Sequence, residues 1–494
     1  MSEAPHVTVA QGEVAGTMDF GVAAYLGLPY AAAPFGELRM QPPAPPPAWH
    51  GVRDATAFGP TVPKAVYPPQ YAALLADPVI AGEESLNLNV WTPDPTGSGL
   101  PVFVWIHGGS FTNGSGGIYN GAAFARDGIV CVTINYRLQA EGFLHTADGT
   151  SNLGLLDQLA ALAWVRDNIA AFGGDPGKVT VGGESAGAMS VTTLLSMPQA
   201  AGLFRSAIAQ SGAAAHVMPP EVGSRVTEWL AADLGVEPTR SALAAVSPQD
   251  VVAAAQRLQA DVRTAPDRVQ RWGALTASLL PFMPTVDGEV LPRPPLDAIA
   301  SGAGADVALM TGTNGEEMRL FLVADRVIDH IDEAAFAGGA QAYGLDPSAA
   351  AAAYAPEGTA PGDALSALVT DWFFAVPAVR VAEARAATGS ATWMYRFDHR
   401  SLACEGTLGA AHAVEIPFVF DTLDEPETED LLGPGPSQAV ADTVHATWVR
   451  FIRDADPGWA AYDMSRRTTM VFGEQDGPVE NPRAERYALW EGIR

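Results

Sequence analysis

The chain has 494 residues, of which 48% are hydrophobic, and a formal net charge of −28. Its length allows a large buried core that needs neither disulfides nor a metal for stability. The negative charge excludes nucleic acid and anionic membranes as expected partners, because both bind basic surfaces. Lysine occurs only as Lys64 and Lys178, and the Ala- and Gly-rich composition is typical of a high-GC genome, with a salt-adapted surface as the alternative.

The N-terminal segment and the cysteines indicate the compartment. Residues 1–6 carry neither the basic nor the apolar part of a signal peptide, and no run of 18 apolar residues is present. The two cysteines, Cys131 and Cys404, cannot form a disulfide framework, and the apolar run around Cys131 favours a buried thiol. We therefore expect a cytoplasmic bacterial protein without a membrane partner, either a monomer or a weak homo-oligomer.

The first hundred residues contain short strand-like segments separated by Gly and Pro. The Pro-rich segment 41–47 is predicted to be a rigid surface connector, although a polyproline ligand for a partner has the same composition. Residues 62–82 contain tyrosines and several prolines and are expected to form a long, mobile loop. Because irregular loops of this length are usually functional, a lid over a pocket is one hypothesis for it.

From Leu100 onward, apolar strand-like runs alternate with segments of helical periodicity, and no linker interrupts them. This alternation predicts one large α/β domain over residues 1–494. An Ala-rich, helix-forming region at about 215–300 is expected to form a cap. Buried strands are predicted at 101–106, 129–135, 179–181, 206–210, 306–310, 392–397 and 469–472, and helices at 155–165 and from 188 onward.

The pentapeptide Gly183-Glu184-Ser185-Ala186-Gly187 fits the nucleophile-elbow pattern G-x-S-x-G. A predicted strand precedes it and a predicted helix follows it, which is the context that presents a serine Oγ at the edge of a sheet. Upstream, a glycine pair at 108–109 follows a buried strand, and its backbone N–H groups predict an oxyanion hole. A phosphate-binding loop is the alternative, but the Lys-Ser/Thr pair that should follow is absent.

An activated serine needs a base, and an acid that orients the base. Position favours His412, in a loop of small residues, over His399, which ends a predicted strand, without deciding between them. Glu316 and Glu317 follow the strand that ends near Met310, at a strand end where sites gather. An acid-rich first turn of a helix explains these two carboxylates equally well.

Several blocks along nearly the whole chain are similar to the type-B carboxylesterase family, which includes carboxylesterases, cholinesterases and bacterial p-nitrobenzyl esterases. The resemblance implies the α/β-hydrolase fold, with a large, mostly parallel mixed sheet flanked by helices and with helical cap insertions. It implies hydrolysis of small to medium carboxylic esters through an acyl-enzyme, with no cofactor and no metal. The blocks are 26–31, 86–91, 152–158 and 168–176.

Carried over residue by residue, the resemblance implies that Ser185 is the nucleophile, His412 the base and Glu317 the acid. Ser211 would hydrogen-bond the acid, and Met318 replaces the glycine that usually follows the acid. A lipase, a carbamate or amide hydrolase and a non-catalytic binding member of the same fold are the alternatives. The oxyanion donors would be the backbone N–H groups of Gly108, Gly109 and Ala186.

The chain also departs from the family near its N-terminus. Val62 and Ser85 stand where secreted members pair two cysteines, so the resemblance predicts a loosely tethered 62–82 loop. Arg39 and Glu83 match a buried ion pair of the family.

An aromatic triplet is the remaining candidate. Trp372, Phe373 and Phe374 would line an acyl or alcohol pocket under one interpretation, whereas aromatic residues at helical spacing are also typical of plain core.

Overall fold

The computed structural model describes residues 4–474 and 476–494, and its contacts divide the chain into two compact units. The first unit contains the residues up to 66, 77–207 and 215–298. The second unit contains residues 67–76, 208–214 and 299–494. Strand β10 (Ser206–Gln210) spans one of the boundaries between the units.

The sheet of the first unit has parallel strands at its centre. Strand β7 (Leu100–Ile106) pairs in parallel with β8 (Val130–Ile134) and with β9 (Gly174–Glu184). All of β8 and most of β7 are buried, as expected for strands rich in apolar residues that are covered on both faces. Antiparallel strands extend the sheet beyond β8 in the order β6 (Asn87–Thr92), β4 (Val22–Pro29) and β3 (Thr17–Asp19).

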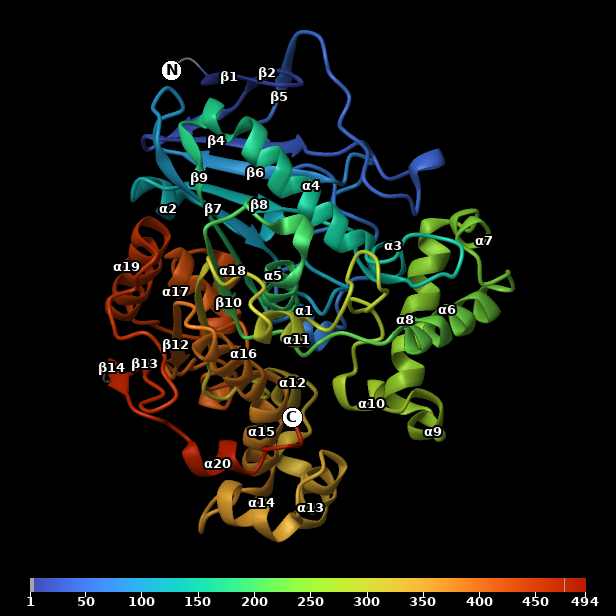
Figure 1. Cartoon of the computed structure of the whole chain (residues 1–494), viewed down its shortest axis with the longest axis vertical. Coiled ribbons are helices and arrows are strands. Elements are labelled where there is room, and N and C mark those ends of the chain that lie inside the picture. Colours follow the sequence, from blue (N-terminus) through green and yellow to red (C-terminus); the bar gives the residue numbers. More distant parts are fainter. Residues whose placement is uncertain (1–3, 475) are drawn as a thin grey trace. The chain divides into compact units, whose positions relative to one another are not determined.

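Helices cover this sheet (Figure 1). Helices α4 (Leu153–Asn168) and α5 (Ala186–Ser196) pack on β9, whereas α2 (Ala122–Arg126) packs on β4, β6 and β8. Every residue of α5 is buried, so the helix that follows the nucleophile elbow lies within the core. Further elements of this unit are α3 (Gln139–Phe143) and a small sheet of β1 (His6–Val9), β2 (Gly12–Ala15) and β5 (Val52–Asp54).

The predicted cap region is helical, and its residues 215–298 belong to the first unit. Most of its helices are drawn in green in Figure 1, and α6 (Pro220–Leu234) packs on α8 (Pro248–Thr264). Both helices are amphipathic and bury an apolar stripe that includes Leu230 of α6 and Leu258 of α8. The helices are α6 (Pro220–Leu234), α7 (Arg240–Ala244), α8 (Pro248–Thr264), α9 (Arg268–Trp272) and α10 (Leu275–Ser278), followed by α11 (Pro295–Ala300).

The second unit contains another parallel set of strands. Strand β12 (Thr392–Phe397) pairs in parallel with β11 (Ala308–Asn314) and with β13 (Thr469–Phe472), and β14 (Gly477–Val479) is antiparallel to β13. Helix α16 (Val376–Ala387) packs on β11 and β12, and α17 (Ile416–Phe420) packs on α19 (Gln438–Asp454). The other helices are α1 (Pro69–Ala72), α12 (Arg319–Ala324), α13 (Glu333–Ala342), α14 (Pro347–Tyr354), α15 (Pro361–Thr370), α18 (Pro426–Leu432) and α20 (Ala484–Ala488).

Helices α15 and α16 are joined by a π-helical turn, Asp371–Ala375, into one continuous helix, Pro361–Ala387. Within the described part of the chain, this is the one helix whose length and mean hydropathy of 1.4 would suffice to cross a membrane. Of its most apolar stretch, 72% is buried inside the protein. Such burial is typical of a core helix.

The predicted strands between 101 and 472 are confirmed, with small differences in their bounds. The largest difference is in β9, which begins at Gly174 rather than at Val179. The sequence Gly174-Asp175-Pro176 has the composition of a turn, yet its backbone already runs extended beside β7, where Leu100 pairs with Gly174.

Candidate active site

Ser185 stands between β9 and α5, on the sharp turn that the motif predicts. Its backbone has φ 55° and ψ −123°, a strained conformation for a residue with a Cβ. The neighbouring glycines make the turn possible, because a Cβ on Gly187 would lie 2.0 Å from the oxygen of Ile106. A Cβ on Gly183 would lie 2.6 Å from the Gly187 carbonyl carbon. The elbow therefore depends on glycine at both positions.

The glycine turn after β7 lies against this serine, because β7 and β9 end at the same level in the sheet. A Cβ on Gly108 would lie 3.0 Å from the Ser185 Cβ, and Gly109 has φ 105°, which favours glycine. No described residue accepts a hydrogen bond from the N–H of Gly108, Gly109 or Ala186. Ala186 is the first residue of α5, where a helix leaves its N–H groups without an internal partner. The three predicted oxyanion donors are thus available.

The neighbouring His107 is buried beside the same turn. Its Nδ1 lies 2.8 Å from the Gly108 oxygen, and its ring stacks on Tyr136 at a centroid distance of 4.5 Å. Burial lowers the pKa of His107 to about 3. The imidazole is therefore neutral at ordinary pH and brings no charge to the turn.

In the second unit, Glu317 and His412 form a buried hydrogen bond. His412 Nδ1 lies 2.7 Å from Glu317 Oε2, and the two side chains are 6% and 0% exposed. The backbone N–H of His412 donates to the backbone carbonyl oxygen of Glu317 at 3.2 Å, and this second hydrogen bond joins the two chain segments. A carboxylate on Nδ1 fixes the orientation of the imidazole and places a proton on that nitrogen.

The competing candidates occupy different surroundings. The ring of His399 packs against Phe397 and Phe418, and burial lowers its pKa. Glu316 forms an ion pair with Arg400 at the surface and accepts the N–H of Ala410 at 2.9 Å. Of the alternatives that the sequence left open, His412 and Glu317 are therefore the two that meet.

Met318 needs no glycine-like backbone. Its φ of −70° and ψ of −9° lie in the right-handed helical region, at the start of α12. The backbone N–H of Met318 donates to Thr370 Oγ1 at 3.1 Å. The departure from the family at this position leaves the adjacent carboxylate in place.

A second buried carboxylate, Glu415, extends the network, and sequence reasoning did not single it out. Its Oε2 accepts from Asn314 Nδ2 at 2.5 Å, and its Oε1 accepts from Gln210 Nε2 at 3.1 Å. Trp448 Nε1 fixes Gln210 by donating to its oxygen at 2.7 Å. Burial and the nearby Glu317 raise the pKa of Glu415 to about 6. In the sequence, the one feature that could have pointed to Glu415 is its position three residues after His412.

The predicted role of Ser211 is not what the structure shows. Its hydroxyl is buried without a hydrogen-bond partner among the described residues, and its backbone N–H donates to the Gly312 oxygen at 2.8 Å. The second oxygen of Glu317 instead accepts the backbone N–H of Asn314 at 2.7 Å. Asn314 is the last residue of β11, and its N–H binds the carboxylate three residues later in the chain.

The predicted ion pair between Arg39 and Glu83 is wrong. Glu83 is exposed, whereas Arg39 binds Glu141 at 2.6 Å, with both side chains more than nine-tenths buried. Arg39 also donates to the carbonyl oxygens of Ala244 and Val246. Its guanidinium therefore points toward α3 and α7, and Glu83 stays in water.

The aromatic triplet lies on the π-helical turn Asp371–Ala375. Phe374 is buried, and its ring centroid lies 4.8 Å from that of His412. Trp372 is covered by Tyr343, at 4.8 Å between centroids, and by the guanidinium of Arg494, at 4.3 Å. The triplet thus supports His412 through Phe374, and Trp372 belongs to the packing of the unit.

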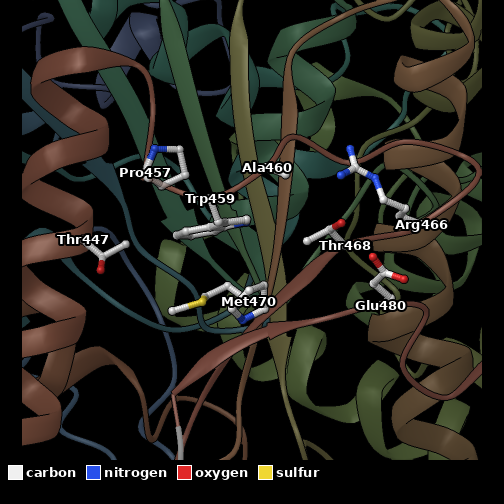
Figure 2. A pocket seen from close by; sticks show the side chains of 10 residues that line it. Thr447, Pro457, Trp459, Ala460, Arg466, Thr468, Met470 and Glu480 are labelled. Carbon is white, nitrogen blue, oxygen red and sulfur yellow. The ribbon is translucent and has the colours of Figure 1, made fainter.

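A pocket of about 420 Å³ lies elsewhere in the second unit, between α19, β13 and β14. Figure 2 shows the Trp459 ring near Met470, with Arg466 and Glu480 at the other end. No predicted site residue lines this pocket. It is separate from the candidate active site.

Comparison with known proteins identifies the family of the chain. The sequence model described as the carboxylesterase family matches residues 3–490. The chain belongs to the carboxylesterase family. As a member of it, the protein is a serine hydrolase of carboxylic esters with the α/β-hydrolase fold.

Individual relatives cover nearly the whole chain. The para-nitrobenzyl esterase of Bacillus subtilis is 36% identical over 97% of both chains. The phenmedipham hydrolase of Pseudarthrobacter oxydans is 34% identical over 96% of both chains. Among solved structures, the carboxylesterase EST55 of Geobacillus stearothermophilus superposes with a TM-score of 0.85 at 36% identity, covering 98% of this chain and 99% of that one.

Proposed function

We propose that this carboxylesterase works through a triad of Ser185, His412 and Glu317, with the N–H groups of Gly108, Gly109 and Ala186 as the oxyanion hole. The buried hydrogen bond between His412 Nδ1 and Glu317 Oε2 supports the proposal most directly. Together with the strained turn at Ser185, it supplies the base, the orienting acid and the nucleophile that acyl transfer requires.

In the acylation step, His412 Nε2 takes the proton of Ser185 Oγ while Oγ attacks the ester carbonyl carbon. The oxyanion that forms accepts hydrogen bonds from the three backbone N–H groups. The imidazolium then gives its proton to the ester oxygen, the C–O bond breaks and the alcohol leaves. Glu317 stays ionised and stabilises the imidazolium through Nδ1.

In the deacylation step, His412 takes a proton from water as the water oxygen attacks the acyl carbon. The second tetrahedral intermediate collapses, Ser185 Oγ leaves with the proton from His412, and the carboxylic acid is released. Every step is a proton transfer or an acyl transfer and needs no cofactor.

We propose small to medium esters as substrates, with p-nitrobenzyl and p-nitrophenyl esters as the first to assay because a 36% identical relative is named para-nitrobenzyl esterase. The test is hydrolysis of p-nitrophenyl esters of increasing acyl length by wild type, His412→Gln and His399→Gln. His412→Gln should lower kcat by several orders of magnitude, and His399→Gln should keep most activity. The reverse result would assign the base to His399.

A further inference from the structure

A buried ion pair closes the base of the 62–82 loop. Lys64 Nζ binds Asp77 Oδ1, and the two side chains are 0% and 5% exposed. Both residues belong to the first unit, whereas the intervening residues 67–76 belong to the second. Close by, the N–H of Thr61 donates to the Ile80 oxygen at 3.0 Å. The prediction of a loosely tethered loop is therefore wrong at the base of the loop. The mobility of the loop stays a prediction.

The same ion pair binds the turn that follows the oxyanion glycines. Lys64 Nζ donates to the Gly114 oxygen at 2.9 Å, and Asp77 Oδ1 accepts the Gly114 N–H at 3.2 Å. Asp77 Oδ2 accepts from Asn113 Nδ2 at 2.8 Å, and this amide also donates to the Ala65 oxygen at 2.6 Å. Both ends of the loop are thus bonded to residues 113–114.

Residues 113–114 in turn hold the oxyanion glycines. The Gly109 oxygen accepts the N–H of Asn113 at 2.8 Å and that of Thr112 at 2.9 Å. A Cβ on Gly114 would lie 2.4 Å from the Gly108 oxygen, so the two backbone segments are in direct contact. A displacement of Gly114 would therefore turn the peptide units that carry the Gly108 and Gly109 N–H groups.

The choice of lysine fits this geometry. Only two of the 28 basic residues are lysines, and Lys178 is a surface residue whose side chain is 43% exposed. At position 64 a compact ammonium group bridges a carboxylate and a carbonyl oxygen in a buried space. A guanidinium is wider and planar, so it would need these two oxygens in a different arrangement.

We propose that the Lys64–Asp77 ion pair positions the oxyanion hole and takes the place of the disulfide that Val62 and Ser85 cannot form. The proposal rests on the proposed function, because it needs Gly108 and Gly109 to act as oxyanion donors. Lys64 and Asp77 are positioning residues: they touch the turn that carries the donors and take no part in the bond changes.

The test compares Lys64→Met, Asp77→Asn and the double variant for p-nitrophenyl ester hydrolysis and for the thermal unfolding midpoint Tm. Each single variant leaves one buried group without its partner and should lower both Tm and kcat. The double variant removes both charges, so its Tm should recover most of the loss. It still lacks the bond from Lys64 to Gly114, and its kcat should stay about 10- to 100-fold low with KM changed less than about threefold.

The buried pair Arg39–Glu141 is the matched control, because it lies in the first unit and, among the described residues, Arg39 hydrogen-bonds Glu141, Ala244 and Val246 rather than the oxyanion turn. Arg39→Met/Glu141→Gln should lower Tm and leave kcat near wild type. A trifluoromethyl ketone, whose adduct carries the oxyanion, should bind the Lys64→Met/Asp77→Asn variant more weakly by the same factor as the loss in kcat.

A double variant with wild-type kcat, or a control pair that loses kcat equally, would overturn the proposal. If the double variant does not fold, the same comparison of kcat with KM is made on Asp77→Asn, which keeps the shape of the side chain. Ser185→Ala, run in parallel, separates the two claims: activity retained in Ser185→Ala refutes the proposed function whatever the Lys64 variants do.

Discussion

Glu317 and Glu415 are two buried carboxylates that share one hydrogen-bonding neighbour. Asn314 donates its backbone N–H to Glu317 at 2.7 Å and its side-chain amide to Glu415 at 2.5 Å. Glu317 pairs with His412, whereas Glu415 accepts from the side-chain amides of Asn314 and Gln210. Burial, followed by the charge of the nearby Glu317, raises the pKa of Glu415 to about 6, while the hydrogen bonds from Asn314 and Gln210 act in the opposite direction.

The raised pKa of Glu415 predicts a specific dependence of stability on pH. Below pH 4.5 this carboxyl is neutral in both states, and above about pH 6 it is ionised in both. Between these values the unfolded chain loses the Glu415 proton first. The ionisation of Glu415 therefore lowers the free energy of unfolding as pH rises. The total is about 2 kcal/mol, since one pKa unit corresponds to about 1.4 kcal/mol.

The measurement is urea unfolding of wild type and Glu415→Gln at pH 4, 5, 6 and 7. The wild type should lose about 2 kcal/mol relative to the variant across this range. The variant also loses hydrogen bonds, and this loss lowers its free energy of unfolding equally at every pH. It does not affect the result, because only the change of the free energy of unfolding with pH is compared. Parallel stability curves would show that Glu415 titrates near its ordinary pKa.

Gly108→Ala should damage catalysis more than stability. The new Cβ would lie 3.0 Å from the Ser185 Cβ and 2.9 Å from the Glu184 carbonyl oxygen, so the backbone must shift at the proposed oxyanion hole. Loss of one oxyanion donor costs roughly 10²–10³ in kcat, and a fall of at least about tenfold is expected here. Gly338→Ala is the control, because nothing lies within 4 Å of its Cβ position in α13. Equal kcat in the two variants would contradict the assignment of the turn.

Ser185→Gly should unfold at a higher temperature than the wild type. The φ of 55° and ψ of −123° at this position are strained for serine and accessible to glycine, and such strain costs of order 1–3 kcal/mol. Glycine loses more conformational entropy on folding than serine does, which offsets part of this stabilisation. The net increase in the free energy of unfolding is about 1 kcal/mol. Ser185→Ala keeps a Cβ and the strain, so calorimetry of the two inactive variants isolates the backbone term. A lower Tm for Ser185→Gly than for Ser185→Ala would refute the strain.

Trp372 and Phe373 of the aromatic triplet are expected to have different roles. Trp372→Leu should lower Tm and leave the acyl-length preference unchanged, because Tyr343 and Arg494 already cover the indole. Phe373 is half-buried next to Phe374, so Phe373→Ala should change the relative kcat/KM for short and long p-nitrophenyl esters. If Trp372→Leu changed the acyl-length preference and Phe373→Ala did not, the substrate would lie against Trp372 instead.

Local patterns in the sequence predicted the secondary structure well and the site only in part. The buried apolar runs of β7, β8 and β12 are continuous in the chain, and a strand of that kind forms with few alternatives. The Ser185 turn is also local, since its glycines lie two residues away on either side.

Choosing Glu317 and His412 as the proposed acid and base required the family resemblance, because these two residues meet only through the tertiary fold. The resemblance also introduced an error, because the family ion pair carried over to Arg39 and Glu83 is not formed: the partner of Arg39 is Glu141, far along the chain. The Lys64–Asp77 pair and the position of Glu415 likewise depend on which distant backbone groups they meet. No periodicity or composition encodes those pairings.

The nucleophile is the claim on which the mechanism depends. Treatment with a fluorophosphonate, followed by mass spectrometry of the digested protein, measures it directly. One label per chain is expected, on the peptide that contains Ser185, and no label is expected in Ser185→Ala. A label on another residue, or undiminished labelling of Ser185→Ala, would contradict it.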